Sequence, residues 1–222
     1  MSAILAVDGI DATGKSAVIR EVVARNPELL SVDEFSNTEL GDLIRRIISR
    51  ERFFSLAGKD GQRVEAAESY LLFADTVAKI ERIASSTQQC SAAMERGFLS
   101  LFGYQLARMH RRDMLNLADS FKSSIASSIG ALNQLHSIKY SEVLLVISQE
   151  TLVRRIALRG ECELTPRQSS FLLDAQEAMK EMAHSFAWLV VENDSEESIN
   201  TVAVMIAEQL VTMRLKINTK NV

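Results

Sequence analysis

Residues 9–16 contain the spacing of residue types that most directly implies chemistry in this chain. Gly9 and Gly14 are separated by four residues, and Lys15 and Ser16 follow at once. When such a loop joins a strand to a helix, its backbone N–H groups turn inward around a phosphate. Its lysine reaches the β- and γ-oxygens, and its hydroxyl joins the shell of a Mg²⁺ ion. We therefore expect a nucleotide polyphosphate and Mg²⁺ to bind at Gly9, Ala12, Thr13, Gly14, Lys15, Ser16 and Ala17.

The elements around this loop alternate between strand-like and helix-like patterns. Strands are expected at residues 3–8, 29–32, 91–94, 143–147 and 188–191. Helices are expected at residues 15–25 and 39–54, over a long helical stretch from 99 to about 135, and in segments ending near residues 84, 158, 186 and 215. Five strands separated by helices predict an α/β fold in which helices cover both faces of a parallel sheet.

Length, composition and charge limit the kind of ligand. A chain of 222 residues with 47% hydrophobic residues is long enough for one domain, which we expect to span residues 1–222. A net charge of −4 gives no general attraction to a nucleic-acid polymer or a membrane surface, so a small soluble ligand is expected. No apolar run approaches the ~20 residues of a membrane span. Cys90 and Cys162 lie in unrelated contexts without metal-ligand spacing, which fits a reducing compartment. A cytoplasmic location is therefore expected.

The rest of the chain narrows the class of nucleotide-binding protein. An NKxD run, which reads guanine in switch GTPases, is absent from the sequence. The apolar segment 143–147 does not end in the aspartate that holds the metal in many ATPases. A kinase acting on a small molecule is the class that remains.

Five segments resemble thymidylate kinases and their relatives among nucleotide and deoxynucleoside kinases. They occur in the family's order and read ILAVDGIDATGKS from residue 4, TELGDLIRRII from 38, LLFA from 71, ERGFLSLFGYQ from 95 and WLVVENDSEESI from 188. The resemblance spans nearly the whole chain. It implies the three-layer P-loop kinase fold, ATP-dependent phosphoryl transfer to a (deoxy)nucleoside monophosphate, and a homodimer formed through helices.

The same resemblance implies an acceptor site. Phe73, in the LLFA segment, would stack on a nucleobase, and Tyr104 and Gln105 would help line the base pocket. Asp11, in the loop, would accept a hydrogen bond from the sugar 3′-hydroxyl or hold a metal-bound water. Arg96 would hold the acceptor phosphate.

The resemblance also implies the catalytic charges. Glu95 corresponds to the family's acid near the metal and the acceptor, so Ser16 and Glu95 are the expected metal ligands. In this family an arginine that stabilises the transferred phosphoryl group comes from the loop or from a mobile lid, and the corresponding loop position is Ala12 here. A lid at residues 159–168 is therefore implied, with Arg159 and Arg167 as its catalytic arginines and Gly160 as a possible hinge.

The acceptor side departs from the family pattern. Thymidylate kinases carry an arginine after the second strand, where this chain has Asp33 and Glu34, and another arginine four residues beyond Phe73, where it has Val77. An acid beside a phosphate dianion would repel it.

These departures leave three interpretations open. A monophosphate acceptor could be held by Arg45 or neighbouring arginines on the following helix. A neutral nucleoside could be the acceptor, with Glu34 or Asp33 taking the proton from a 5′-hydroxyl, as the resemblance to deoxynucleoside kinases implies. The chain could also be a nucleotide-binding module without catalysis.

An apolar stripe on one helical face is either core or a dimer interface. Its residues are Phe121, Ile125, Ile129 and Leu132.

Overall fold

The computed structural model describes residues 3–48, 65–85, 91–110, 115–160, 163–195 and 198–218. The end of the helix expected at residues 39–54 lies outside these ranges. Cys90 and Cys162 also lie outside them.

The strands form one parallel sheet of five strands in the order β2-β3-β1-β4-β5. They are β1 (Ala3–Asp8), β2 (Leu30–Val32), β3 (Ala92–Glu95), β4 (Lys139–Val146) and β5 (Leu189–Glu192). The expected parallel sheet is confirmed. β4 begins four residues before the expected start at residue 143, because its first half carries Tyr140 and Glu142, two buried side chains that do not follow an apolar pattern.

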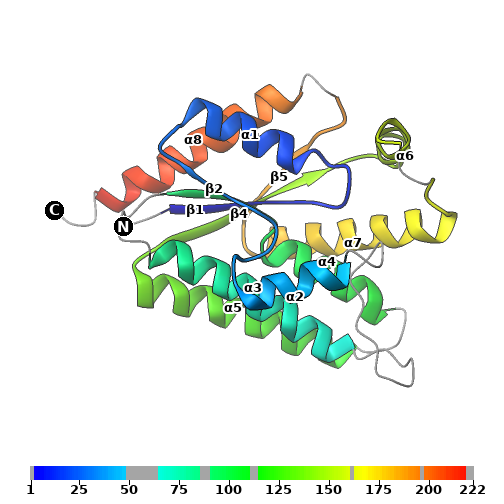
Figure 1. Cartoon of the computed structure of the whole chain (residues 1–222), viewed down its shortest axis with the longest axis horizontal. Coiled ribbons are helices and arrows are strands. Elements are labelled where there is room, and N and C mark those ends of the chain that lie inside the picture. The colour runs from blue at the N-terminus through cyan, green and yellow to red at the C-terminus, as the bar shows by residue number, and fades with distance from the viewer. Residues whose placement is uncertain are drawn as a thin grey trace.

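Helices cover both faces of the sheet, as Figure 1 shows. They are α1 (Lys15–Arg25), α2 (Glu39–Ile48), α3 (Glu65–Ala84), α4 (Phe98–His110), α5 (Leu115–His136), α6 (Gln149–Leu158), α7 (Pro166–Ser185) and α8 (Ser198–Asn218). α1 and α8 lie on one face, while α3, α4, α5 and α7 lie on the other (Figure 1). The stretch expected to be helical from 99 to 135 therefore contains two helices, α4 and α5, which pack against each other.

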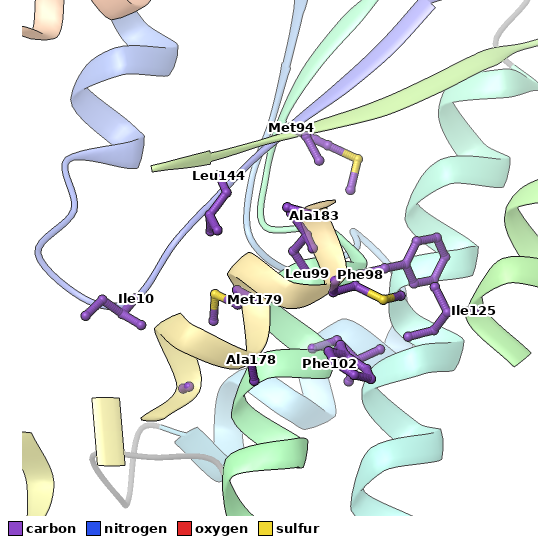
Figure 2. Close-up of a cluster of buried hydrophobic side chains, with 14 of the residues drawn as sticks. Ile10, Met94, Phe98, Leu99, Phe102, Ile125, Leu144, Ala178, Met179 and Ala183 are labelled. Carbon is purple, nitrogen blue, oxygen red and sulfur yellow. The ribbon is translucent and has the colours of Figure 1, made fainter. Parts of the chain in front are cut away.

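The core has two parts because the sheet is buried on both faces. On the α1–α8 side, Leu5 and Val7 of β1 meet apolar residues of both helices. On the other side, residues of β3, β4, α4, α5 and α7 converge, and Figure 2 shows Phe98 and Phe102 of α4 with Ile125 of α5 in this cluster. α4 is thus the central helix of the larger core. Its packing there determines which of its side chains lie near the carboxyl ends of the strands.

The apolar stripe on α5 belongs to this core. Ile125, Ile129 and Leu132 are buried within the chain. Burial therefore explains these three positions without a partner subunit. The side chain of Phe121 lies outside the described part.

Among the described residues, none of the helices combines the length and the apolar character needed to span a membrane.

Candidate active site

The loop between β1 and α1 has the backbone that its glycines predict. Gly9 has a φ of 143°, and a Cβ atom there would lie 2.6 Å from the carbonyl oxygen of Leu145 in β4. Only glycine allows both this conformation and this approach. Ala12 (φ 64°) and Gly14 (φ 88°) are also left-handed, and α1 begins directly after Gly14. The loop is thereby held at the carboxyl end of β1, at the positive end of a helix.

Lys15 lies over this loop with its side chain buried. Its Nζ donates a hydrogen bond to the carbonyl oxygen of Ile10 at 2.9 Å. Burial and the nearby charge of Arg96 lower the pKa of the Lys15 ammonium to about 8, although Asp11 and Glu95 act in the opposite direction. An ammonium group in this position is suited to binding an anion, because a bound phosphate would stabilise the positive charge that burial makes unfavourable.

Two residues that follow β4 and β5 hold the loop in place. Arg155 of α6 donates from Nη1 to the carbonyl of Ala12 at 3.1 Å and from Nη2 to the carbonyl of Asn193 at 2.7 Å. The buried Asn193, just after β5, donates from Nδ2 to the carbonyl of Thr13 at 2.7 Å. Asn193 was not predicted as a site residue from the sequence; its place one residue after a strand was the signal that could have found it.

The two expected metal ligands meet at the start of α1. Ser16 Oγ donates to Glu95 Oε2 at 2.9 Å. Within the described ranges no group of three or more His, Cys, Asp or Glu side chains could hold a metal alone. A hydroxyl with one carboxylate nevertheless fits Mg²⁺, which takes few protein ligands and completes its octahedron with water and phosphate oxygens.

Arg96 joins the loop to the segment after β2. Its Nη2 donates to Asp11 Oδ1 at 2.8 Å, its Nη1 donates to the carbonyl of Gly9 at 3.3 Å, and its Nε lies 2.6 Å from Glu34 Oε1. Burial acts to raise the pKa of the Asp11 carboxyl, but the charges of Arg96 and Lys15 outweigh it and hold that pKa below its usual value. The carboxylates of Asp11 and Glu34 therefore offset the charge of the Arg96 guanidinium.

Tyr104 completes this group from α4. Its hydroxyl donates to Asp11 Oδ1 at 3.2 Å, and the Arg96 guanidinium lies 5.3 Å from the centre of its ring. Burial, reinforced by the Asp11 charge, raises the pKa of Tyr104 well above its usual value, so the phenol stays a hydrogen-bond donor at neutral pH.

Two buried carboxylates fix the start of α4. Asp8, at the end of β1, accepts from the backbone N–H groups of Gly97 (3.0 Å) and Ser100 (2.8 Å). Glu142 of β4 accepts from those of Phe98 (2.9 Å) and Leu99 (2.8 Å). Burial and the neighbouring Asp8 charge raise the pKa of Glu142 well above its usual value. The otherwise unpaired N–H groups of the first turn are thus satisfied by two strands, which sets the position of every α4 side chain.

A cavity of about 220 Å³ opens between the loop, α3 and α4. It is lined by Asp11, Glu34, Phe35, Ile48, Leu72, Asp75, Thr76, Lys79, Arg96, Gly97, Ser100, Leu101, Tyr104, Gln105 and Arg108. Of the expected substrate residues, Asp11, Glu34, Arg96, Tyr104 and Gln105 are thus brought together. Ser100 Oγ is buried here without a hydrogen-bond partner among the described residues, which indicates room for a ligand's polar group.

Phe73 is not among the described residues that line this cavity. Its ring lies 5.6 Å from that of Phe98 and packs against the core together with Val77. The next residue on this face of α3 is the fully buried Ile80. The face that lines the cavity, which starts at Leu72, is rotated by about one residue, or roughly 100°. In this structure Phe73 thus packs beside the cavity-lining face of α3, and its stacking on a base stays a prediction.

Arg45 also points elsewhere. Its guanidinium donates to the carbonyls of Phe35 (3.3 Å) and Ser36 (3.0 Å) and to Asp42 Oδ1 (2.7 Å). It stabilises the turn that precedes α2, and it is not among the described residues lining the cavity.

The two arginines of the expected lid lie in different surroundings. Arg159 directly follows α6 as its C-cap residue and lines an open cleft with Ala12, Gly14 and Asn200. Arg167 is exposed in the first turn of α7, which begins at Pro166, and is not among the described residues lining either cavity. Gly160, the expected hinge, has a φ of 66°, the conformation that ends many helices.

Three charged residues of the cavity escaped the sequence analysis. Lys79 and Asp75 lie on α3, and Asp75 accepts from the backbone N–H of Ser36 at 3.1 Å. Arg108, on α4, forms an ion pair with the fully buried Glu68. The available signal was polar residues at helical spacing in otherwise apolar segments.

The strand order and the loop define the class of fold. In an open parallel sheet, ligands bind beyond the carboxyl ends of the strands where the strand order reverses. The loop after β1 and residues 95–97, at the end of the neighbouring β3, meet at such a point. The chain thus has the architecture of an α/β nucleotide-binding protein.

Comparison with known proteins narrows this class. The chain is 27% identical over 174 residues to the thymidylate kinase of Sulfurovum sp. (strain NBC37-1), covering 78% of this chain and 81% of that protein. It is 26% identical over 199 residues to the thymidylate kinase of Campylobacter curvus (strain 525.92), covering 88% and 92%. No protein-family model matches the chain.

A solved structure confirms the fold. The thymidylate kinase of Candida albicans superimposes with a TM-score of 0.65 at 14% identity, covering 95% of this chain and 92% of that one. The expected α/β fold of the thymidylate kinase type is therefore correct, and the sequence relatives support a nucleotide kinase function.

Proposed function

We propose that this chain transfers the γ-phosphoryl group of ATP to a (deoxy)nucleoside monophosphate. The observation that carries the proposal is the position of Arg96, which contacts Gly9 and Asp11 of the loop and also lines the cavity beside it. A donor in the loop and an acceptor in the cavity would share this guanidinium. The similarity to thymidylate kinases over most of the chain supports the same reaction.

On the donor side, the backbone of residues 9–16 would surround the triphosphate tail, and Lys15 would leave the Ile10 carbonyl to contact phosphate oxygens. Mg²⁺, when bound with ATP, would neutralise charge on the transferred group, held by Ser16 and Glu95. Little covalent chemistry is required of the protein, because positioning and positive charge stabilise phosphoryl transfer.

On the acceptor side, the carboxylates around Arg96 are the main obstacle to a phosphate dianion. A monophosphate would have to displace Glu34 or Asp11 from the guanidinium, with Tyr104 and Gln105 contacting the rest of the nucleotide. Residues 159–168 would close over the phosphates and bring Arg159 and Arg167 to the transferred group.

We further propose that the protein is cytoplasmic and forms a homodimer.

A second candidate, nucleoside phosphorylation, is favoured by one observation. Glu34 is held 2.6 Å from Arg96 at the cavity, where a carboxylate could take a proton from a neutral 5′-hydroxyl. A nucleoside carries no phosphate, so its binding would not require Glu34 or Asp11 to leave the Arg96 guanidinium.

An ADP-release assay with ATP, Mg²⁺ and a panel of nucleosides and nucleoside monophosphates tests both candidates. The proposal expects turnover with at least one monophosphate and a matching diphosphate product. It also expects a loss of about 10²–10³ in kcat for Lys15→Met, which excludes a contaminating kinase. Turnover with nucleosides alone would favour the second candidate. ADP binding without turnover on the whole panel would leave a nucleotide-binding module and overturn both.

A further inference from the structure

A buried lysine on α3 connects the ends of two neighbouring strands. Lys79 is 3% exposed, and its Nζ donates to the carbonyl oxygens of Glu34 (2.7 Å), Glu95 (3.0 Å) and Arg96 (2.7 Å). An ammonium group has three hydrogens to donate, and each has an acceptor here.

These three carbonyls lie where the sheet stops pairing. β2 and β3 run parallel up to the pair Val32 and Met94, after which the chain leaves toward α2 and α4. Beyond that pair the β2–β3 ladder ends, although Glu95 still pairs with Val7 of β1. Carbonyl groups there have no partner across β2 and β3, and burial without a partner is costly. Lys79 supplies the missing donors, so one side chain determines how far apart the two segments lie.

The same two segments carry the charged pair of the cavity. Glu34 and Arg96 contact each other through their side chains at 2.6 Å, while their backbone carbonyls bind one ammonium. Arg96 also has a left-handed backbone with a φ of 58°, which is unfavourable for a residue with a Cβ atom. A donor on its carbonyl helps hold that conformation.

The surrounding charges keep this lysine able to donate. Burial lowers the pKa of Lys79 to about 8, while Asp8, Asp75, Glu34 and Glu142 act to raise it. At neutral pH the ammonium form therefore persists although the group is buried.

We propose that Lys79 is a positioning residue for the acceptor site: by binding the three carbonyls it sets the separation of the Glu34 and Arg96 side chains, and through it the affinity for the acceptor. This inference rests on the proposed function insofar as it concerns the acceptor. Its structural part, the placement of residues 34 and 96, is independent of any activity.

The kinetic test compares Lys79→Met and Lys79→Gln with a destabilised control, Ile206→Ala, in the core on the opposite face of the sheet. Methionine removes all three donors and glutamine keeps two, so the acceptor KM should rise about tenfold or more for methionine and less for glutamine. The KM for ATP should rise clearly less than the acceptor KM, because Arg155 and Asn193 also hold the loop in place. Ile206→Ala, or Ile206→Val if its Tm is closer to that of Lys79→Met, should alter neither KM.

Hydrogen–deuterium exchange at pH 7 gives a readout without turnover. Lys79→Met should speed exchange in peptides covering residues 33–36 and 95–98 at least tenfold relative to the wild-type chain, with little change in residues 4–8 and 189–192. Unchanged exchange in the first two peptides, or equal changes throughout as in Ile206→Ala, would overturn the proposal, as would a parallel rise of both KM values. If the wild-type chain phosphorylates no acceptor, the proposed function fails, and the exchange result alone decides whether Lys79 positions these segments.

Discussion

Ser16 and Glu95 are 79 positions apart in the chain, yet Ser16 Oγ donates to Glu95 Oε2 at 2.9 Å. The contact follows from the sheet, because β3 pairs with β1 in a register that aligns Glu95 with Val7, two residues before the loop begins. The hydroxyl at the start of α1 and the carboxylate at the end of β3 must therefore meet. Under the proposed function, a Mg²⁺ ion bound to ATP phosphates would contact the protein at this position.

The first prediction concerns this pair. In Glu95→Gln the carboxylate charge is lost while the shape is kept, so the Mg²⁺ concentration that gives half-maximal activity at fixed ATP should rise about 10–100-fold. A Mg²⁺ titration of the initial rate measures this midpoint. Glu192→Gln is the matched control, because Glu192 also ends a strand and is exposed. A midpoint for Glu95→Gln equal to that of the control would exclude Glu95 from the metal site.

The second prediction concerns the protonation of Lys15. Its pKa of about 8 in the free protein means that much of the lysine is neutral above pH 8, whereas bound phosphate favours the ammonium form and raises the pKa. Nucleotide binding should therefore take up a proton at pH 8.5. The Kd for ADP should weaken as pH rises above 8, by up to about tenfold per pH unit, and should not change through Lys15 well below pH 7.

Calorimetry of ADP binding in two buffers with different ionisation enthalpies measures this uptake. Lys15→Arg is the control, since a guanidinium remains charged at every pH used and should abolish the uptake. Heats that do not depend on the buffer at pH 8.5 would contradict the prediction. Uptake that persists in Lys15→Arg would assign the proton to another group, with Lys79 as the first to test.

The third prediction compares two glycines. A Cβ atom at Gly97 would lie 2.3 Å from the Tyr140 hydroxyl and 2.8 Å from Cδ of Glu142, the residue that holds the start of α4. Gly97→Ala should therefore lower the free energy of unfolding by about 1–3 kcal/mol. At Gly130, on α5, an added Cβ would meet no atom of the described residues within 4 Å, so Gly130→Ala should raise it by up to about 1 kcal/mol. Urea unfolding measures both, and equal stabilities of the two variants would refute the packing around Gly97.

The loop and the strands were predictable because their signals are local. Residues 9–16 combine glycine spacing with a lysine and a hydroxyl, and the apolar runs around β1 and β5 have the length of buried strands. The first half of β4 was missed because Tyr140 and Glu142 are polar and buried for a reason that lies elsewhere in the chain. Glu142 accepts from the start of α4, a contact that no local pattern reveals.

The acceptor site was only partly predictable for a different reason. Resemblance selected the α3 segment but not the side chains of that helix that line the cavity, because a shift of one residue turns a helical side chain by about 100°. Phe73 is partly buried and packs against the core, while Asp75 and Lys79 line the cavity. The three carbonyls that bind Lys79 come from the segment after β2 and from the end of β3, so their role follows only from the assembled sheet.

The last prediction separates the two candidate acceptors through Glu34. If the acceptor is a monophosphate, as proposed, Glu34→Gln removes an anion that competes for Arg96, so the acceptor KM should fall severalfold while kcat changes little. If the acceptor is a nucleoside, the same change removes the general base, and kcat should fall by about 10²–10⁴. Steady-state kinetics with the best acceptor of each kind distinguish the two results.

Asp33→Asn is the matched control for this test. Asp33 is the adjacent acid, is exposed, and is not among the described residues that line the cavity, so its amide should leave both constants within about twofold. A fall in kcat for Asp33→Asn but not for Glu34→Gln would move the base to Asp33 and contradict the role of the Glu34–Arg96 pair. A lower KM for the monophosphate in Glu34→Gln alone would show that the carboxylate on Arg96 is the barrier that this acceptor has to displace.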